Sequence, residues 1–411
     1  MSDKEPLITH IYTADPSANV FNDTLYIYPS HDIPTDIQDN DNGDQYAMDD
    51  YHVFSMPSIP GPVTDHGVVL SKDSVPWVSK QLWAPDACTK NGKYYLYFPA
   101  RDHDGIFRIG VAEGDKPEGP FTAAKEPIKG SYSIDPCSFV DEDGEAYLYF
   151  GGIWGGQLQC WGNQHEKFER EKYDTMEPSE GPALGPRVAK LSEDMHSLAT
   201  PVHEIEILDE AGEKIKAADH DRRFFEAAWI HKYKGKYYLS YSTGDTHYLC
   251  YAIGDKPMGP FTYGGRILEP VVGWTTHHSI VEFKGKWWLF YHDSSLSGGK
   301  NHLRCVKVRE IFYDDEGKIK IEPLAVVMLM QFSRKFAGEV DAANGLSEAR
   351  AEDRVMRTAS IFLAENAERR SEGESGEPWI TVKPDWGVID AGLRASAVMV
   401  WSGLAVSEVR R

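Results

Sequence analysis

The sequence has few cysteines and no long hydrophobic run. Its five cysteines, at positions 88, 137, 160, 250 and 305, are odd in number and never fall in a Cys-x-x-Cys spacing. This pattern argues against a disulfide framework and against a zinc cluster built on cysteine. Residues 1–17, MSDKEPLITHIYTADPS, lack the apolar run of a signal peptide, and no stretch approaches a membrane span. We therefore expect a cytoplasmic protein, although a mature form that has lost its leader would look the same.

Positive charge is also scarce in this chain of 411 residues. Lys and Arg number 43 against 64 Asp and Glu, which gives a formal net charge of −21, and no basic cluster offsets it. Such a surface repels the phosphates of nucleic acids and anionic lipids, so we expect neither nucleic acid nor a membrane as a partner. Hydrophobic residues make up 41% of the chain, which is typical of a soluble globular protein with a sizeable core.

A short aromatic segment is repeated along the chain. GKYYLYF at 92–98 recurs as GEAYLYF at 144–150, GKYYLSY at 235–241 and GKWWLFY at 285–291, with a weaker copy, DTLYIYP, at 23–29. Each copy has a turn residue followed by alternating aromatic and aliphatic positions, which indicates a β-hairpin. Copies about fifty residues apart, each with several short strands, are typical of the blades of a β-propeller. The fold class predicted is all-β, a five-bladed β-propeller.

Acidic residues and one histidine stand at equivalent places before the five hairpins. These residues are Asp15, Asp86, Asp135, Glu226 and His277. The innermost strand of each propeller blade lines the central axis, so the starts of these strands should converge at one mouth. Carboxyl groups gathered in a cleft do not all ionise freely, and this separates acid from base. For any one of them alone, a place at the end of a solvated loop is the simpler interpretation.

Taken in order, these motifs resemble glycoside hydrolase family 43 over about residues 8–322. The resemblance rests on ADPS, WAPD, SIDP, the aromatic segment around Glu226, HHSIVEFKGKWWLFYH and LRCVKVREIFYDDEGKI. It implies a five-bladed propeller that cleaves xylose- or arabinose-containing glycans with inversion at the anomeric carbon. We expect an exo-acting β-xylosidase that releases xylose from xylo-oligosaccharides, with an added α-L-arabinofuranosidase activity left open. The alternatives are an α-L-arabinofuranosidase acting on arabinoxylan or arabinan, and a non-catalytic glycan-binding propeller, which would not need both an acid and a base.

The resemblance also implies catalytic roles for three carboxyl groups. Asp15 resembles the general base, Glu226 the general acid, and Asp135 the carboxylate that orients the acid and raises its pKa. An acid that is protonated near neutrality needs its pKa raised by about two units from about 4.3. Apolar neighbours such as Phe225 and Trp229, together with a second carboxylate, supply the known causes of such a rise. Inversion predicts a separation of roughly 6.5–9.5 Å between the carboxyl groups of base and acid.

Sugar-binding and metal-binding positions follow from the same resemblance. Arg304 should reach the sugar and the catalytic carboxylates, unless it pairs with a surface acid instead. The other predicted substrate-binding residues are Trp83 and Phe225, as aromatic walls, and His31 and Asp32, as hydroxyl-binding groups at the rim. His277 should contact a structural calcium ion in the central channel, mostly through water. Because alternation along a strand sends adjacent residues to opposite faces, only one of His277 and His278 can face inward, and we favour His277.

The sequence assigns no single role to the remaining tryptophans or to one acidic loop. Trp77, Trp154 and Trp274 should divide between the aromatic wall and plain core packing. The segment QDNDNGDQYAMDD at 38–50 is as acidic as a calcium-binding loop, but Gln38 falls where the first EF-hand ligand should be. We therefore expect a solvated loop over the mouth of the propeller.

The aromatic hairpin rhythm ends near residue 322. Residues 323–411 are rich in Ala, Glu and Arg, and the part SEARAEDRVMRTASIFLAENAERRSEGESG is typical of a segment that is partly helical and then flexible. Larger xylosidases of the family carry a β-sandwich after the propeller, and this segment is too short and too different in composition to be one. The domains predicted are a catalytic propeller at 8–322 and a C-terminal extension of unknown structure at 323–411.

Overall fold

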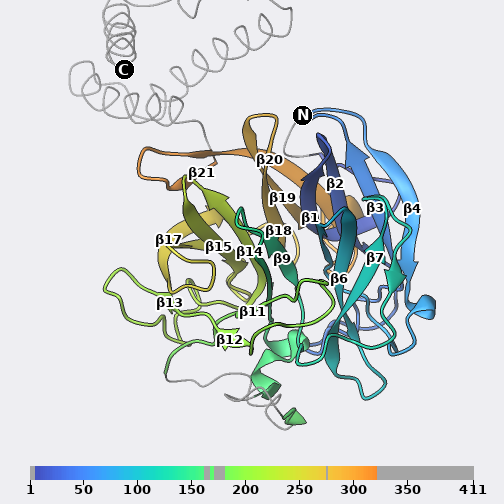
Figure 1. The fold of residues 1–411 in the computed structure, drawn as a ribbon, viewed down its shortest axis with the longest axis horizontal. Coiled ribbons are helices and arrows are strands. Elements are labelled where there is room, and N and C mark those ends of the chain that lie inside the picture. The colour runs from blue at the N-terminus through green and yellow to red at the C-terminus, as the bar shows by residue number, and fades with distance from the viewer. Residues whose placement is uncertain (1–4, 162–166, 171–180, 275, 322–411) are drawn as a thin grey trace, which may run out of the picture. The chain divides into compact units, whose positions relative to one another are not determined.

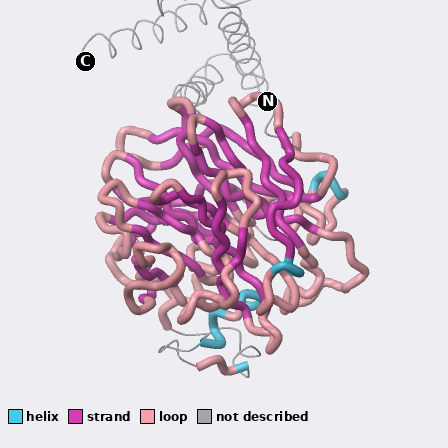
Figure 2. The backbone as a smooth tube through the Cα atoms, turned by 45° about the vertical axis from the view of Figure 1, so that its right-hand side comes forward, coloured by secondary structure: helices cyan, strands magenta, loops and turns pink. Residues whose placement is uncertain are grey.

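The computed structural model describes residues 5–161, 167–170, 181–274 and 276–321 (Figure 1). The predicted C-terminal extension lies outside the described residues. Within them, the chain is built from short antiparallel sheets, and the helical segments are single turns in the loops between strands (Figure 2). No helix in this part of the chain is long and apolar enough to cross a membrane.

The first three sheets follow one another along the chain, and each is ordered from an inner to an outer strand. The first sheet holds β1 (Tyr12–Phe21), β2 (Thr24–Asp32), β3 (Asp50–Met56) and β4 (Thr64–Ser71). The second holds β5 (Asp86–Lys90), β6 (Lys93–Arg101), β7 (Phe107–Gly114) and β8 (Thr122–Ala123). The third holds β9 (Cys137–Val140), β10 (Ala146–Phe150), β11 (Arg187–Lys190) and β12 (His203–Glu204).

Two further sheets complete the ring. The fourth holds β14 (Glu226–Tyr233), β15 (Lys236–Ser242), β16 (Leu249–Gly254) and β17 (Phe261–Leu268), with β13 (Ile207–Leu208) added in parallel at its outer edge. The fifth holds β18 (His278–Phe283), β19 (Lys286–Asp293), β20 (Cys305–Tyr313) and β21 (Ile319–Lys320). Five sheets whose innermost strands, β1, β5, β9, β14 and β18, lie against one another around the hub are the five blades of a β-propeller, so the predicted fold class is confirmed.

Two-residue turns explain why the same hairpin recurs. In four hairpins both central residues have positive φ, as a type I′ turn requires, and this turn matches the twist of the flanking strands. The pairs, with their φ values, are Asn22 and Asp23 (49° and 59°), Asn91 and Gly92 (55° and 75°), Lys234 and Gly235 (47° and 76°), and Lys284 and Gly285 (53° and 73°). The first copy manages without glycine because Asn and Asp tolerate this conformation better than other residues.

Burial of both faces holds each blade in place. Leu96, Tyr97 and Phe98 are consecutive in β6, point alternately to the two faces, and are all completely buried. A fully buried aromatic or aliphatic side chain stabilises a fold by about 1.5–3 kcal/mol relative to an exposed one. Each blade therefore packs against a neighbouring blade on both of its faces.

The ring is closed between the first and the last blade. The backbone N–H of Thr13 donates to the carbonyl of Arg304 (3.0 Å), and that of Leu7 donates to the carbonyl of Val306 (2.8 Å). β1 lies against β18, β19 and β20, as Figure 1 also shows. This closure brings residues from the start and the end of the propeller sequence to the same place.

Candidate active site

Three backbone positions at the hub have unusual conformations. Asp15, Asp135 and Ala227 have φ of 48°, 56° and 62°, a region that residues other than glycine rarely adopt. The ladder between β1 and β2 shifts register between Ala14 and Ser17, and that between β14 and β15 shifts between Glu226 and Trp229. Such bulges re-aim side chains, and here they lie at the starts of two innermost strands.

The carboxyl groups predicted to be catalytic converge on one pocket. Asp15, Asp135 and Glu226 come from the first, third and fourth blades, and all line one pocket. His277 and Arg304, from the fifth blade, line the same pocket. Five residues separated by up to 289 positions in the sequence therefore share one hollow at the hub.

Asp86 belongs to the hub but not to the pocket lining. Its carboxylate accepts hydrogen bonds from Ser17 Oγ, from Ser138 Oγ (2.7 Å) and from the amide of Asn19 (3.2 Å). These donors come from the first and third blades, so Asp86 joins three innermost strands. Its role in the described structure is to hold the hub together.

Asp15 is buried but surrounded by donors. Its Oδ1 accepts a hydrogen bond from Arg304 Nη1 (2.8 Å), and its Oδ2 accepts one from Ser30 Oγ (2.7 Å). Its backbone N–H donates to His292 Nδ1 (3.0 Å). Burial acts to raise the pKa of Asp15, but the positive charge of Arg304 outweighs it, and the pKa falls to about 2. The group is therefore a carboxylate at neutral pH.

Arg304 is aimed at Asp15 by a second carboxylate. Asp32 Oδ2 accepts from Nε of Arg304 (2.9 Å) and from its backbone N–H (2.8 Å), while Oδ1 accepts from Nη2 (2.8 Å). This two-pronged contact fixes the plane of the guanidinium group. Arg304 is only 3% exposed, and burial acts to lower its pKa, but Asp15 and Asp32 outweigh burial and raise it, so the guanidinium stays charged.

The structure corrects the expected positions of His31 and Asp32. Neither is among the residues that line the pocket. Asp32 is 1% exposed and lies behind Arg304, whereas His31 contacts Asp50 through Nδ1 (2.7 Å). Adjacent residues on a strand point to opposite faces, so these two cannot both reach a sugar at the rim.

Glu226 has the opposite electrostatic environment from Asp15. Burial is the largest cause of its raised pKa, and the negative charge of Asp15 adds to it. Arg304 opposes both effects, and the pKa of Glu226 rises to about 8. Asp135 lies beside it: Oδ2 of Asp135 accepts the backbone N–H of Ala227 (2.8 Å), the residue after Glu226. Burial and the charge of Glu226 raise the pKa of Asp135 well above its usual range as well.

Of the two adjacent histidines, His277 is the one that lines the pocket. Its Nδ1 lies 3.7 Å from Asp135 Oδ2 and 3.9 Å from Asp15 Oδ1. His278 is completely buried, and its Nε2 shares a hydrogen bond with Ser240 Oγ (2.6 Å). Burial lowers the pKa of His277 to about 4, so its ring is neutral at pH 7.

Aromatic side chains form the walls of the pocket. Trp83 and Phe225 line it as expected, and so do Trp154 and Trp274, whose rings stack with centroids 5.9 Å apart and an interplanar angle of 15°. Trp77 instead stacks on Phe98 in the core. Of the three tryptophans whose role the sequence left open, two line the pocket and one packs in the core.

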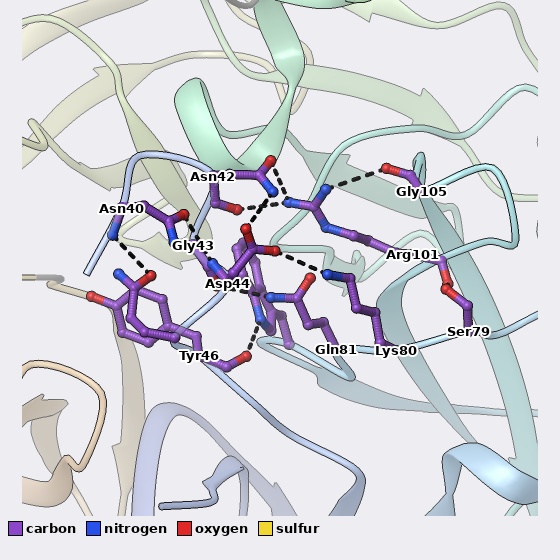
Figure 3. Close-up of polar contacts among 12 residues, drawn as sticks. Asn40, Asn42, Gly43, Asp44, Tyr46, Ser79, Lys80, Gln81, Arg101 and Gly105 are labelled. Carbon is purple, nitrogen blue, oxygen red and sulfur yellow. Dashed lines mark hydrogen bonds and ion pairs between the residues drawn. The ribbon is translucent and has the colours of Figure 1, made fainter. Parts of the chain in front are cut away.

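The acidic loop at 38–50 borders the pocket and is held from the second blade (Figure 3). Arg101 Nη2 donates to the carbonyl (2.7 Å) and the side-chain oxygen (3.0 Å) of Asn42. Gln81 Nε2 donates to the carbonyl of Gly43 (2.8 Å), and Lys80 pairs with Asp44 (2.9 Å). Gly43 has a φ of +72°, and a Cβ there would come within 2.6 Å of Trp83. The loop is a fixed wall of the pocket whose polar groups bind neighbouring side chains.

Several pocket and support residues were not anticipated from the sequence. Ser30 and His292, both in contact with Asp15, lie near the ends of β2 and β19, the second strands of the first and last hairpins. A two-residue turn at 284 and 285 places His292 opposite His277, so counting back from the turn would have found it. Tyr46, whose carbonyl accepts from Trp83 Nε1 (2.9 Å), had no comparable signal in the sequence.

Comparison with known proteins agrees with this geometry. The model of glycosyl hydrolases family 43 matches residues 5–319. The chain is 71% identical over 322 residues to xylosidase/arabinosidase 43A of Humicola insolens, covering 77% of this chain and 98% of the relative. It is 56% identical over 319 residues to a xylosidase/arabinosidase of Bacteroides ovatus, covering 77% and 97%.

Solved structures show the same relationship. A family 43 β-xylosidase/α-arabinofuranosidase from a compost microbial metagenome, in complex with xylotriose and in a calcium-free form, has a TM-score of 0.75 and 63% identity, covering 78% of this chain and 97% of that one. A GH43_1 enzyme from Xanthomonas citri complexed with xylotriose has a TM-score of 0.73 and 55% identity, covering 77% and 92%. The likeness first found in the motifs is thereby confirmed: this chain is a glycoside hydrolase and belongs to glycosyl hydrolase family 43.

Proposed function

We propose that the protein is an inverting, exo-acting β-xylosidase that releases xylose from xylo-oligosaccharides, with α-L-arabinofuranosidase as a second activity. The observation that carries the proposal is the opposite displacement of two pKa values in one pocket. Asp15 has a pKa of about 2 and Glu226 a pKa of about 8, so near neutrality one is a base and the other an acid. Hydrolysis of a glycoside needs one group of each kind.

The proposed reaction assigns one proton transfer to each group. Asp15 accepts a proton from the attacking water, whose oxygen forms the new bond to the anomeric carbon. The bond to the leaving oxygen breaks, and that oxygen receives the proton of Glu226. Inversion requires room for the water, and a separation of roughly 6.5–9.5 Å between the two carboxyl groups remains our expectation.

Neighbouring residues support these two roles. Arg304 contacts Asp15 at 2.8 Å and stabilises the carboxylate that the base needs. Asp135 accepts a hydrogen bond from the backbone N–H of Ala227, next to Glu226, and so helps to position the acid. The aromatic side chains of Trp83 and Phe225 line the pocket, which suits the apolar C–H faces of a sugar.

The substrate class is supported by the relatives. Two of the similar structures hold xylotriose, and two relatives carry both xylosidase and arabinosidase in their names. The two sugars place their reacting groups similarly, so one pocket can accept either. The second candidate is an α-L-arabinofuranosidase acting on arabinoxylan or arabinan, which the same dual names favour. A non-catalytic glycan-binding propeller is set aside because the chain belongs to a family of hydrolases.

Hydrolysis of two aryl glycosides tests the proposal. Purified protein should cleave 4-nitrophenyl β-D-xylopyranoside with a higher kcat/KM than 4-nitrophenyl α-L-arabinofuranoside, and should shorten xylotriose by one unit at a time. Proton NMR of the first product should show α-xylose if the configuration is inverted. A preference for the arabinofuranoside would establish the second candidate, and β-xylose as the first product would contradict inversion.

Calcium in the central channel is a separate proposal, with His277 as its protein contact. Ca²⁺ takes about six to eight oxygen ligands. The carboxylates of Asp15 and Asp135 lie 3.9 and 3.7 Å from His277 Nδ1, and both are assigned to the chemistry. The described residues thus supply only part of a coordination sphere, and we assign no step to the ion. Calcium added to chelator-treated protein should raise the Tm of the wild type but not of His277→Ala; an equal response in both proteins would remove His277 from the site.

We also propose that the enzyme works in the cytoplasm, on short imported oligosaccharides. Cell fractionation with detection of the protein tests this directly. Recovery of most of the activity from the medium or the cell envelope would contradict it.

A further inference from the structure

A second group of metal-ligating side chains lies on the first blade, apart from the pocket. His31 is in β2, and Asp50 and His52 are in β3. One ligating atom from each of the three lies within 4.8 Å of the other two. None of the three lines the active-site pocket. Their side chains are 19%, 22% and 15% exposed, so the cluster is partly enclosed but within reach of solvent.

The distances within this cluster are close to those of a tetrahedral site. Zinc binds imidazole nitrogen and carboxylate oxygen at about 2.0–2.2 Å, which places two ligand atoms about 3.4 Å apart. His31 Nδ1 is 2.7 Å from Asp50 Oδ1, and His52 Nε2 is 3.9 Å from the same oxygen. To reach this spacing, the first distance has to lengthen by about 0.7 Å and the second to shorten by about 0.5 Å.

A neighbouring carboxylate already orients one of the imidazole rings. His52 Nδ1 lies 3.0 Å from Asp65 Oδ1, and Asp65 is itself held by the backbone N–H of Gly67 (2.7 Å) and by His10 Nε2 (2.7 Å). With Nδ1–H donating to Asp65, the lone pair of His52 Nε2 is directed away from that contact and toward the side of Asp50. Histidine ligands of metals are commonly supported in this way, through the nitrogen that does not bind the ion.

We propose that His31, Asp50 and His52 bind one divalent transition-metal ion of the Zn²⁺ type outside the active site. Two imidazoles and one carboxylate suit Zn²⁺ or Co²⁺, whereas Ca²⁺ prefers oxygen ligands alone. Three protein ligands leave a fourth position for water. The ion replaces the proton that His31 and Asp50 share, and it cross-links β2 to β3. This site is independent of the catalytic roles proposed above.

Cobalt is the direct probe of this site, because Co²⁺ bound to imidazole absorbs visible light. The full-length protein, stripped of metal with a chelator and dialysed, is titrated with Co²⁺. We expect a saturable absorption band that Zn²⁺ abolishes by displacement. The double variant with His31→Gln and His52→Gln should lose the band, and its circular dichroism and Tm without metal report whether it folds.

Three further variants distinguish this site from other histidines. His66→Gln is the matched control, because His66 lies on the same blade but bonds to Ser55 Oγ, and it should keep the band. His277→Gln should also keep it. Asp65→Asn retains all three ligands and should weaken Co²⁺ binding by about tenfold through loss of the support to His52.

Binding of the metal ion should also raise the thermal stability of the protein. Zn²⁺ at a hundredfold excess over its Kd should raise the Tm of the wild type by roughly 5 °C and leave that of the double variant unchanged. Absence of a cobalt band in the wild type, its survival in the double variant, or its loss in His277→Gln alone would each overturn the proposal.

Discussion

Asp15 and Glu226 lie in one pocket, yet the pKa of one falls to about 2 and that of the other rises to about 8. Burial acts in the same direction on both groups, so it cannot separate them. The difference comes from Arg304, which bonds to Asp15 at 2.8 Å and is fixed by Asp32. Once Asp15 is a carboxylate, its charge helps to keep the proton on Glu226.

Removal of the proposed acid should depend on the leaving group. Glu226→Gln should lower kcat on xylobiose by about 10²–10⁴-fold, because the leaving sugar needs a proton. An aryl xyloside with a highly acidic phenol leaves without one, so its kcat should fall much less. Steady-state kinetics on both substrates measure this. Glu282→Gln, at an exposed position of β18, is the control, and equal losses on both substrates would remove Glu226 from the role of acid.

The pH profile follows from the two pKa values. Activity needs Asp15 without its proton and Glu226 with it, so kcat/KM should fall as the pH rises through about 8, and at the acidic end only as the pH approaches about 2. Arg304 lowers the pKa of both groups, so Arg304→Met should move the whole profile upward, by about one pH unit or more. An alkaline limb that stays in place or moves down in this variant would contradict the electrostatic account.

At the scale of elements, the pocket wall depends on a loop that a neighbouring blade holds. The loop at 38–50 joins β2 to β3, yet several of its polar contacts come from Lys80, Gln81 and Arg101, beside and within β6. Arg101 is 2% exposed, whereas the Lys80 side chain is 51% exposed. Buried hydrogen bonds to a charged group contribute about 1.5–3 kcal/mol, and exposed ion pairs contribute less than about 1 kcal/mol.

Loosening the loop should therefore affect substrate binding through Arg101. Arg101→Met keeps much of the side-chain length but removes the donors to Asn42, and we expect the KM for xylobiose to rise about tenfold with a smaller change in kcat. Lys80→Met removes the exposed contact to Asp44 and should change KM by less than about threefold. Equal effects of the two variants on KM would show that the buried hydrogen bonds of Arg101 do not control the position of this loop.

At the scale of the whole molecule, the contacts that close the ring of blades also assemble part of the active site. The N-terminal segment pairs with the fifth blade through Leu7 and Thr13, and Asp15 follows on the same strand as Thr13. The Asp15–Arg304 ion pair thus forms only when the first and last blades meet. Ile8 is 2% exposed and packs in the apolar cluster that the two blades share.

A cavity in the apolar cluster between the first and last blades should lower the stability of the entire propeller. Ile8→Ala should reduce the free energy of unfolding by about 2–4 kcal/mol, measured by denaturant titration. Thr9→Ala, at the next and exposed position, should change it by less than about 0.5 kcal/mol. A negligible effect of Ile8→Ala would mean that the terminal segment does not support the closure.

Part of this protein was predictable from residues near each other in the sequence. The alternation of GKYYLYF and its relatives, with Asn, Asp, Lys and Gly at the turns, determines hairpins because turn conformation and strand alternation are local properties. Repetition of the hairpin determines the blades, and the place of Asp15, Asp135, Glu226 and His277 before the hairpins determines that they meet at the hub.

Only the tertiary structure decided what each side chain meets there. His31 and Asp32 are adjacent in the sequence, but one contacts Asp50 and the other holds Arg304, 272 positions away. Trp77 joins the core while Trp154 and Trp274 line the pocket. These outcomes, and the opposite pKa shifts of Asp15 and Glu226, depend on bulges and on contacts between blades. Such contacts exist only after the ring closes, so no segment of the sequence determines them by itself.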